Sequence, residues 1–296
     1  MSASGDMRAV RRAMDALERA EILDAPAAAI AGTFRSRLGP GPLKDAISGT
    51  WLGHALHPML TDVVIGAFVS ASLLDLLGTD RDGKATERLI AIGVLAYPAT
   101  AVTGTSDWAD SELGDARVRR VGLAHAAVNA VSLTLYTFSL IARRRGARGR
   151  GKLLGLAGAT ALGAAGYLGA HMSFVQGVGV DQTAFDPGPD DWTHAAESGS
   201  VPAGQLCRVV VDETPVLVLR HHDGLHAIHD RCSHRGCALS DGEVDGEAVV
   251  CPCHGSRFRL EDGAIERGPA TAPQPAYETR ESGGRIEIRR RSSALR

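Results

Sequence analysis

Four long apolar stretches between Leu56 and Val180 constrain this chain more than any other feature. A helix of about 20 apolar residues crosses the hydrocarbon core of a bilayer with its backbone groups hydrogen-bonded internally. Short connections separate the stretches, so the pattern predicts an up-and-down bundle of four transmembrane helices. The first stretch runs from about Leu56 to Leu77 and has the charge-free core Val63–Leu74; the others are Leu89–Ser106, Val121–Ala142 and Leu153–Val180. A soluble all-α domain is the alternative, but the last two stretches have no polar stripe.

The chain after residue 180 has a different character, because short β-type runs alternate with turn signals such as Asp223-Gly224 and Asp262-Gly263. Such spacing predicts a small antiparallel sandwich or barrel. We therefore expect an α+β protein of two domains, a four-helix membrane bundle followed by an antiparallel β-sandwich. The expected divisions are an amphipathic tail (1–48), the membrane domain (49–180), a linker (181–190), the β domain (191–290) and a tail (291–296).

Charge indicates the surroundings of the two domains. The net charge is −2 and only 4% of residues are aromatic, so nucleic acid is not an expected partner. Basic residues gather in the loops at 79–88 and 142–152, whereas residues 153–207 contain no Lys or Arg. Because basic loops stay in the cytoplasm, we expect a multi-pass protein of the cell membrane, in contact with lipid, with its β domain on the extracytoplasmic side.

Two short boxes in the β domain carry metal-binding side chains. Cys232-Ser-His234 and Cys251-Pro-Cys-His254 each supply one cysteine and one histidine. Two thiolates and two imidazoles can hold a [2Fe–2S] cluster with one donor type on each iron. A structural zinc site is the alternative. Zinc knuckles more often pair Cys with Cys and His with His, so the pattern favours the cluster.

These boxes and the turn Gly268-Pro269-Ala270 resemble the Rieske [2Fe–2S] domain over about residues 191–290. The resemblance implies that Cys232, His234, Cys251 and His254 ligate the cluster and that Ser256 donates a hydrogen bond to a cluster sulfur. It also implies a disulfide between Cys237 and Cys253, as in the Rieske proteins of bc-type complexes. Phe258 replaces the tyrosine of high-potential members, so we expect an elevated potential below the top of the Rieske range.

The expected function follows from this resemblance. A Rieske cluster tethered to lipid implies transfer of single electrons between donor and acceptor proteins, or from a quinol. Whether the chain is a carrier or part of an oxidoreductase stays open. The alternative is a small quinol-oxidising enzyme in which membrane histidines bind haem b or a quinone.

Four histidines motivate that alternative. The run from Gly49 to Pro58, which includes His54 and His57, resembles the entry of a bacterial four-helix membrane domain family of unknown function. The up-and-down order of the spans predicts that His54, His57, His125 and His171 lie at one membrane level. Histidines on facing helices could ligate haem b, a quinone could bind among them, or they could simply be interfacial.

Overall fold

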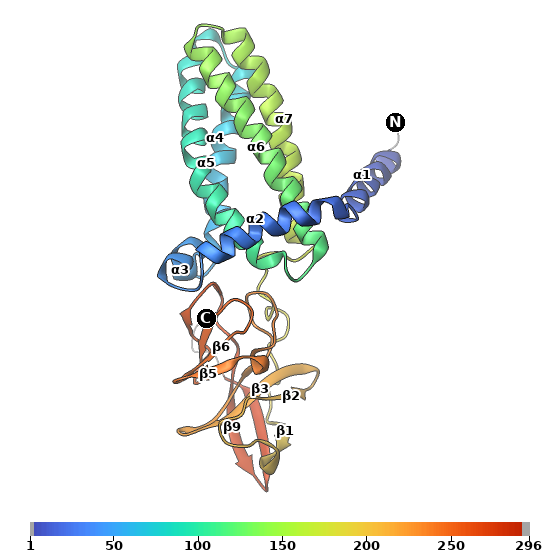
Figure 1. The fold of residues 1–296 in the computed structure, drawn as a ribbon, viewed down its shortest axis with the longest axis vertical. Coiled ribbons are helices and arrows are strands. Elements are labelled where there is room, and N and C mark those ends of the chain that lie inside the picture. The colour runs from blue at the N-terminus through green and yellow to red at the C-terminus, as the bar shows by residue number, and fades with distance from the viewer. Residues whose placement is uncertain (1–2, 292–296) are drawn as a thin grey trace. The chain divides into compact units, whose positions relative to one another are not determined.

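The computed structural model describes residues 3–291, which form two compact units (Figure 1). The first unit contains residues 3–38 and Leu56–Val178, and the second contains Gly39–Ala55 and residues 179–291. Part of the predicted tail at 291–296, namely residues 292–296, lies outside the described residues. The units are helical and mostly β-stranded respectively, as the predicted α+β architecture requires.

Four long helices form the body of the first unit: α4 (Leu56–Leu77), α5 (Gly83–Ser111), α6 (Ala116–Arg144) and α7 (Arg148–Phe174). Each packs against the next, and α7 returns to α4, so the bundle is closed. All four are long and apolar enough to cross a membrane. The predicted four-helix fold is therefore confirmed, except that α7 ends before Val180, where Gly177 and Gly179 adopt left-handed backbone conformations.

An aromatic pair packs at the centre of the bundle. The rings of Phe68 and Tyr136 stack with their centroids 3.9 Å apart. The Tyr136 hydroxyl lies 2.8 Å from Ser72 Oγ and donates to the carbonyl oxygen of Phe68. Glycines at positions 93 and 158 make room, since an added Cβ on either would clash with one of these rings. The buried hydroxyl therefore has hydrogen-bond partners, as an apolar interior requires.

A buried ion pair joins α4 to α6. Arg143 Nη2 lies 2.5 Å from Asp75 Oδ2, and the two side chains are 5% and 7% exposed. Arg143 also donates to Ser139 Oγ. A buried charge is tolerated when it is paired and hydrogen-bonded, which accounts for charged residues at the ends of two otherwise apolar helices.

Two N-terminal helices, α1 (Ala3–Glu18) and α2 (Asp24–Arg37), belong to the same unit. Ala27 and Ala31 of α2 pack with Trp108 and Ala109 of α5. At the same junction, the buried Glu112 carboxylate accepts hydrogen bonds from Arg35 and Arg119. The small alanine side chains allow close helix approach, and the ion pairs hold α2 across the ends of α5 and α6.

The second unit contains two antiparallel sheets. The larger has the order β1-β10-β9-β4-β3-β2 and the smaller β5-β6-β7-β8. The large sheet is nearly closed, because its edge strands β1 and β2 also touch. Its strands are β1 (Thr193–Glu197), β2 (Cys207–Val211), β3 (Thr214–His221), β4 (Gly224–His229), β9 (Ala276–Ser282) and β10 (Arg285–Arg290). The small sheet contains β5 (Glu243–Asp245), β6 (Ala248–Val250), β7 (Arg257–Arg259) and β8 (Ile265–Arg267).

Strand β3 is buried on both faces, and it separates two cores. Its residues Leu217 and Leu219 pack with Val249 and Phe258 of the small sheet. The alternate residues of β3 pack with Ile286 and other residues of the large sheet. Because successive side chains point to opposite faces, one strand serves both cores. The first core also contains Cys232 and Cys251.

Candidate metal centre

The two predicted ligand boxes fold into loops with the same hydrogen-bond pattern. The first follows β4, and the second follows β6. In the first loop the Cys232 N–H donates to the carbonyl of Cys237, and the Gly236 N–H donates back to Cys232. In the second loop Cys251 bonds in the same way with Ser256 and Gly255. Both glycines have left-handed φ angles, +78° and +76°, which glycine adopts at little cost.

This shared geometry brings the two cysteine thiols together. Cys232 and Cys251 are 1% and 2% exposed, neither is in a disulfide, and their side chains are hydrogen-bonded to each other. The hydrogen bond from Cys232 lowers the pKa of Cys251 to about 7, and the same contact together with burial raises the pKa of Cys232. The first deprotonation is therefore made easier and the second harder, as in any pair that shares a proton.

The two loop histidines also lie together. The ring centroids of His234 and His254 are 5.0 Å apart, with an angle of 89° between the rings. Burial and the positive charge of Arg235 hold the pKa of His234 well below its usual value. Burial and the nearby positive charge both favour neutral imidazole, the form of histidine that binds metals.

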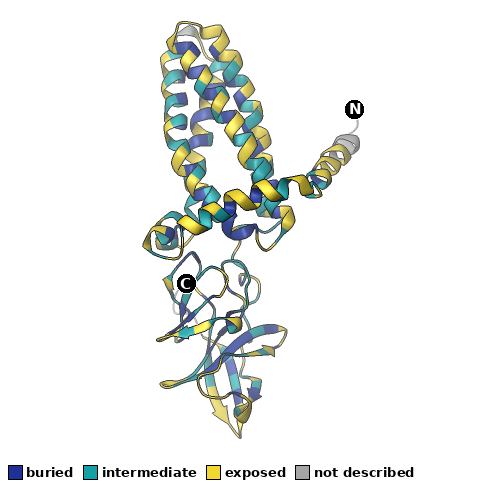
Figure 2. Cartoon of the chain, viewed as in Figure 1, coloured by how far each residue is buried: buried dark blue, intermediate teal, exposed yellow. Residues whose placement is uncertain are grey.

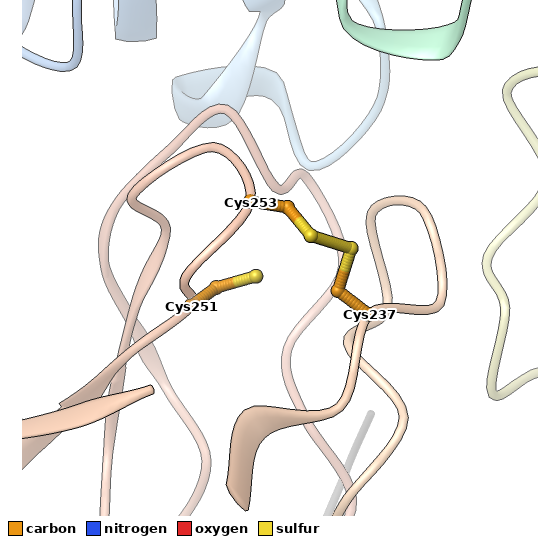
Figure 3. A group of neighbouring side chains, drawn as sticks. All are labelled: Cys237, Cys251 and Cys253. Carbon is orange, nitrogen blue, oxygen red and sulfur yellow. A yellow bond between two sulfur atoms is a disulfide. The ribbon is translucent and has the colours of Figure 1, made fainter. Parts of the chain in front are cut away.

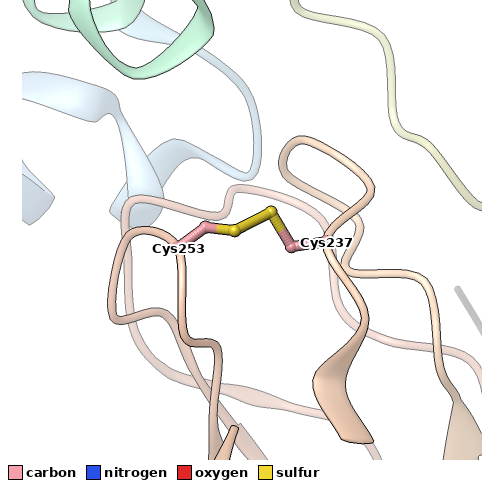
Figure 4. The surroundings of a disulfide bond; sticks show 2 residues. All are labelled: Cys237 and Cys253. Carbon is pink, nitrogen blue, oxygen red and sulfur yellow. A yellow bond between two sulfur atoms is a disulfide. The ribbon is translucent and has the colours of Figure 1, made fainter. Parts of the chain in front are cut away.

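A disulfide joins the loops. Cys237 and Cys253 are covalently bonded with their Cα atoms 6.5 Å apart, as the family resemblance implied (Figure 4). The side chain of Cys251 extends toward this bridge from the neighbouring strand end (Figure 3). These three residues form a close cysteine group, but only Cys251 among them keeps a thiol. The bridge thus restrains the loops without using a predicted ligand.

A third loop, residues 268–270, closes the site from the side of Ser256. Ser256 is buried, and its Oγ accepts a hydrogen bond from the Ala270 N–H at 3.0 Å. A serine hydroxyl can accept and donate at once, so its hydrogen remains available to an acceptor in the site. The Gly268–Pro269 peptide bond is cis. Donation from Ser256 to a cluster sulfur stays a prediction.

Gln274 is a supporting residue that the sequence reasoning missed. Its buried side chain donates to the carbonyl oxygens of His229 and Arg231 and accepts from the Ser233 N–H at 3.0 Å. These contacts hold the chain on both sides of Cys232. A lone glutamine in a Pro-rich run gives no periodic signal, so only the three-dimensional structure identifies it.

The donor set fits a [2Fe–2S] cluster. Two buried thiols form one pair and two imidazoles form another, and the loops carrying them are fixed by backbone hydrogen bonds and a disulfide. A cluster with two cysteines on one iron and two histidines on the other needs this pairing of like donors. A tetrahedral zinc ion could bind the same four atoms, and analysis for iron and acid-labile sulfide distinguishes the two sites.

The predicted membrane histidines have protein partners. His57 Nδ1 lies 3.0 Å from the carbonyl oxygen of Thr100, and His125 Nδ1 lies 2.9 Å from that of Ala165. His171 Nε2 lies 2.9 Å from a carboxylate oxygen of Glu18. His54 belongs to the β-stranded unit, unlike the other three histidines, and it is exposed. The haem and quinone hypotheses for these residues stay predictions.

Known proteins resemble the two parts of the chain separately. Residues 191–278 match the Rieske [2Fe-2S] domain, and residues 53–182 match a predicted membrane protein family (DUF2231). The 3-phenylpropionate/cinnamic acid dioxygenase ferredoxin subunit of Escherichia coli (strain K12) is 37% identical over 97 residues, which cover 32% of this chain and 90% of that protein.

Solved structures of ferredoxins match over a similar length. The ferredoxin of carbazole 1,9a-dioxygenase from Nocardioides aromaticivorans IC177 is 28% identical, with a TM-score of 0.32, covering 34% of this chain and 100% of that one. The Sphingomonas yanoikuyae B1 ferredoxin is 24% identical, with a TM-score of 0.32 and coverages of 34% and 99%. The chain therefore belongs to the Rieske [2Fe–2S] family, whose domain it joins to a domain of the predicted membrane protein family DUF2231.

Proposed function

We propose that this protein is a membrane-anchored Rieske protein that carries single electrons. In this proposal Cys232 and Cys251 ligate one iron of a [2Fe–2S] cluster, and His234 and His254 ligate the other. The observation that carries the proposal is the matched pair of loops, which pairs the two buried thiols and, separately, the two imidazoles. A bound cluster would supply one reversible electron at a potential of about −150 to +300 mV.

The chain's own residues account for an elevated potential. Neutral imidazoles at His234 and His254 bring less negative charge than thiolates would, so the site accepts an added electron more readily. Ser256 is placed to donate a hydrogen bond that strengthens as negative charge grows. The apolar residues packed against Cys232 and Cys251 exclude water from the thiol side. Phe258, within the same apolar cluster, has no hydroxyl to add a further donor.

Anchoring in lipid is supported by the outer faces of the long helices. Large apolar side chains of these helices are exposed, among them Leu73, Leu95, Phe138 and Leu153. Figure 2 shows exposed residues along the long helices. An apolar belt of this kind is costly in water and favourable in hydrocarbon. We place the β domain on the extracytoplasmic side, because the basic loops favour that orientation and the disulfide suits an oxidising compartment.

Redox proteins are the partners that this site suits best. Two of the similar proteins are named as ferredoxins of dioxygenases, so a donor and an acceptor protein are the expected pair for this chain. A quinol is the alternative donor at the membrane.

The proposal is tested by exchanging a donor atom. His254→Cys replaces a neutral ligand with a thiolate, so the midpoint potential of the full-length protein in detergent should fall and its pH dependence should weaken. His194→Cys, on an exposed part of β1, is the matched control and should leave the potential unchanged. Iron and acid-labile sulfide are measured in every sample. A wild-type protein that contains zinc instead, or a His254→Cys variant with an unaltered titration, would exclude the proposed ligands.

A further inference from the structure

The segment Gly39–Ala55, here called the cap, belongs to the β-stranded unit although it lies between two helices of the other unit in sequence. It contains α3 (Pro42–Ser48) and a short 3₁₀ turn, Thr50–Leu52. The match to the Rieske domain covers residues 191–278, so the cap lies outside the matched part of the β-stranded unit, and its contacts show where it acts.

The cap is bonded to the third loop of the candidate centre. The Gly268 N–H donates to Asp45 Oδ1 at 2.9 Å. A Cβ added at Gly268 would lie 2.9 Å from the same carboxylate oxygen and would clash with the side chain of Thr50. Burial raises the pKa of Asp45 despite its hydrogen bond from Gly268. The loop that closes the site beside Ser256 thus fits closely against the cap.

The cap also touches the second ligand loop. A Cβ added at Gly255, the residue after His254, would lie 2.7 Å from Pro40 Cγ. Arg267 donates two hydrogen bonds to the carbonyl oxygen of Gly255, at 3.0 and 2.8 Å, and so ties this loop to the third one. Two of the three loops around the candidate centre are therefore covered by residues 40–50.

Lys44 is a buried lysine of the cap, and it lies next to Asp45 in α3. Lys44 is only 5% exposed, and it interacts electrostatically with His234. Lysine side chains are seldom buried to this extent. A cation held in a site of low dielectric favours any process that adds negative charge nearby, and reduction of a cluster at His234 is such a process.

We propose that the cap is a built-in part of the electron-transfer site, in which Lys44 raises the reduction potential and Asp45 keeps the cap seated over the loops of His254 and Gly268. The seated cap restricts the approach of large redox partners to this face. This inference rests on the proposed function. Asp45 and Lys44 are positioning residues, since they act through the loops and through charge.

Two substitutions at Asp45 test the seating. Asp45→Ala removes the acceptor for the Gly268 N–H, whereas Asp45→Asn removes the same charge but keeps an acceptor oxygen. In the full-length, detergent-purified protein, deuterium exchange in the peptide that contains Gly268 should become several-fold faster in Asp45→Ala and stay near wild type in Asp45→Asn. The rate of oxidation by cytochrome c, relative to that by ferricyanide, should rise in the alanine variant only.

Removal of the lysine charge tests the electrostatic part. Lys44→Met should shift the midpoint potential downward, and Lys44→Arg should restore it. Lys84→Met, which removes an exposed lysine of the other unit, should leave the potential where it is. Equal potentials in Lys44→Met and Lys84→Met, or unchanged exchange and rate ratio in Asp45→Ala, would overturn the inference. A wild type without iron and labile sulfide would instead refute the proposed function itself, so the two failures are distinguishable.

Discussion

Removal of the Cys237–Cys253 bridge has a predictable cost. The bridge closes a chain segment with a sequence separation of 16 residues. For a loop of this size, the restriction of the unfolded chain contributes about 3 kcal/mol to stability. A loss of 1 kcal/mol lowers the unfolding temperature of a domain of about 100 residues by roughly 4 °C or more. The variant with both Cys237→Ala and Cys253→Ala should therefore unfold in its β domain at least about 10 °C below the wild type.

The assay is a thermal scan of the full-length protein at one fixed heating rate, followed through the visible absorbance of the cluster. Cys207→Ala is the matched control, because Cys207 is a free, half-buried cysteine of β2 and its removal should change the midpoint little. At low temperature, the bridge-free variant should still bind iron, since neither mutated residue is a proposed ligand. A midpoint within about 3 °C of the control would refute the entropic reasoning.

Three further predictions concern single side chains. Ser256→Ala should lower the midpoint potential by roughly 65–130 mV, since a hydrogen bond to a charged group is worth about 1.5–3 kcal/mol and about 59 mV corresponds to a tenfold change for one electron. A midpoint potential equal to that of the wild type would show that Ser256 donates no hydrogen bond to the cluster. Asp75→Asn leaves the Arg143 guanidinium buried without its anion, so unfolding of the helical unit in detergent should become easier by about 3–5 kcal/mol; an unchanged unfolding curve would mean that water reaches the pair. His229 is fully buried, and burial lowers its pKa. Below about pH 6.5 the unfolded state therefore binds a proton that the folded state does not, so the free energy of unfolding decreases as the pH is lowered. His229→Gln should therefore lose less stability than wild type between pH 7 and pH 5, and parallel pH profiles would contradict this assignment.

The parts of the structure that follow from local patterns were predictable. Helix α4 begins and ends at the predicted residues Leu56 and Leu77, because a long apolar run signals a membrane-type helix by composition alone. The turn between β2 and β3 is likewise signalled by Asp212 and Pro215, which are both common in turns. Both ligand boxes were recognisable because one cysteine and one histidine at short spacing in each box are typical of a metal-binding loop.

Other parts depend on contacts between residues far apart in sequence. Strands β1, β5 and β8 have no clear signal in the sequence, because they are short and polar and are defined by their pairing partners. The seating of the cap on the β domain has no local signal, because Asp45 and Gly268 are distant in sequence and each is unremarkable alone. The ion pair between Asp75 and Arg143 was not predictable either, since each residue in sequence only indicates the end of a membrane span.

A redox titration of the wild-type protein in detergent, combined with iron and labile-sulfide analysis, tests the central claim most directly. The proposed ligation by two cysteines and two histidines predicts two irons and two sulfides per chain and a pH-dependent midpoint between about −150 and +300 mV. A midpoint near −400 mV, as for clusters held only by cysteines, would contradict the assignment of His234 and His254. A redox-silent protein that contains one zinc ion would contradict the electron-transfer function as a whole.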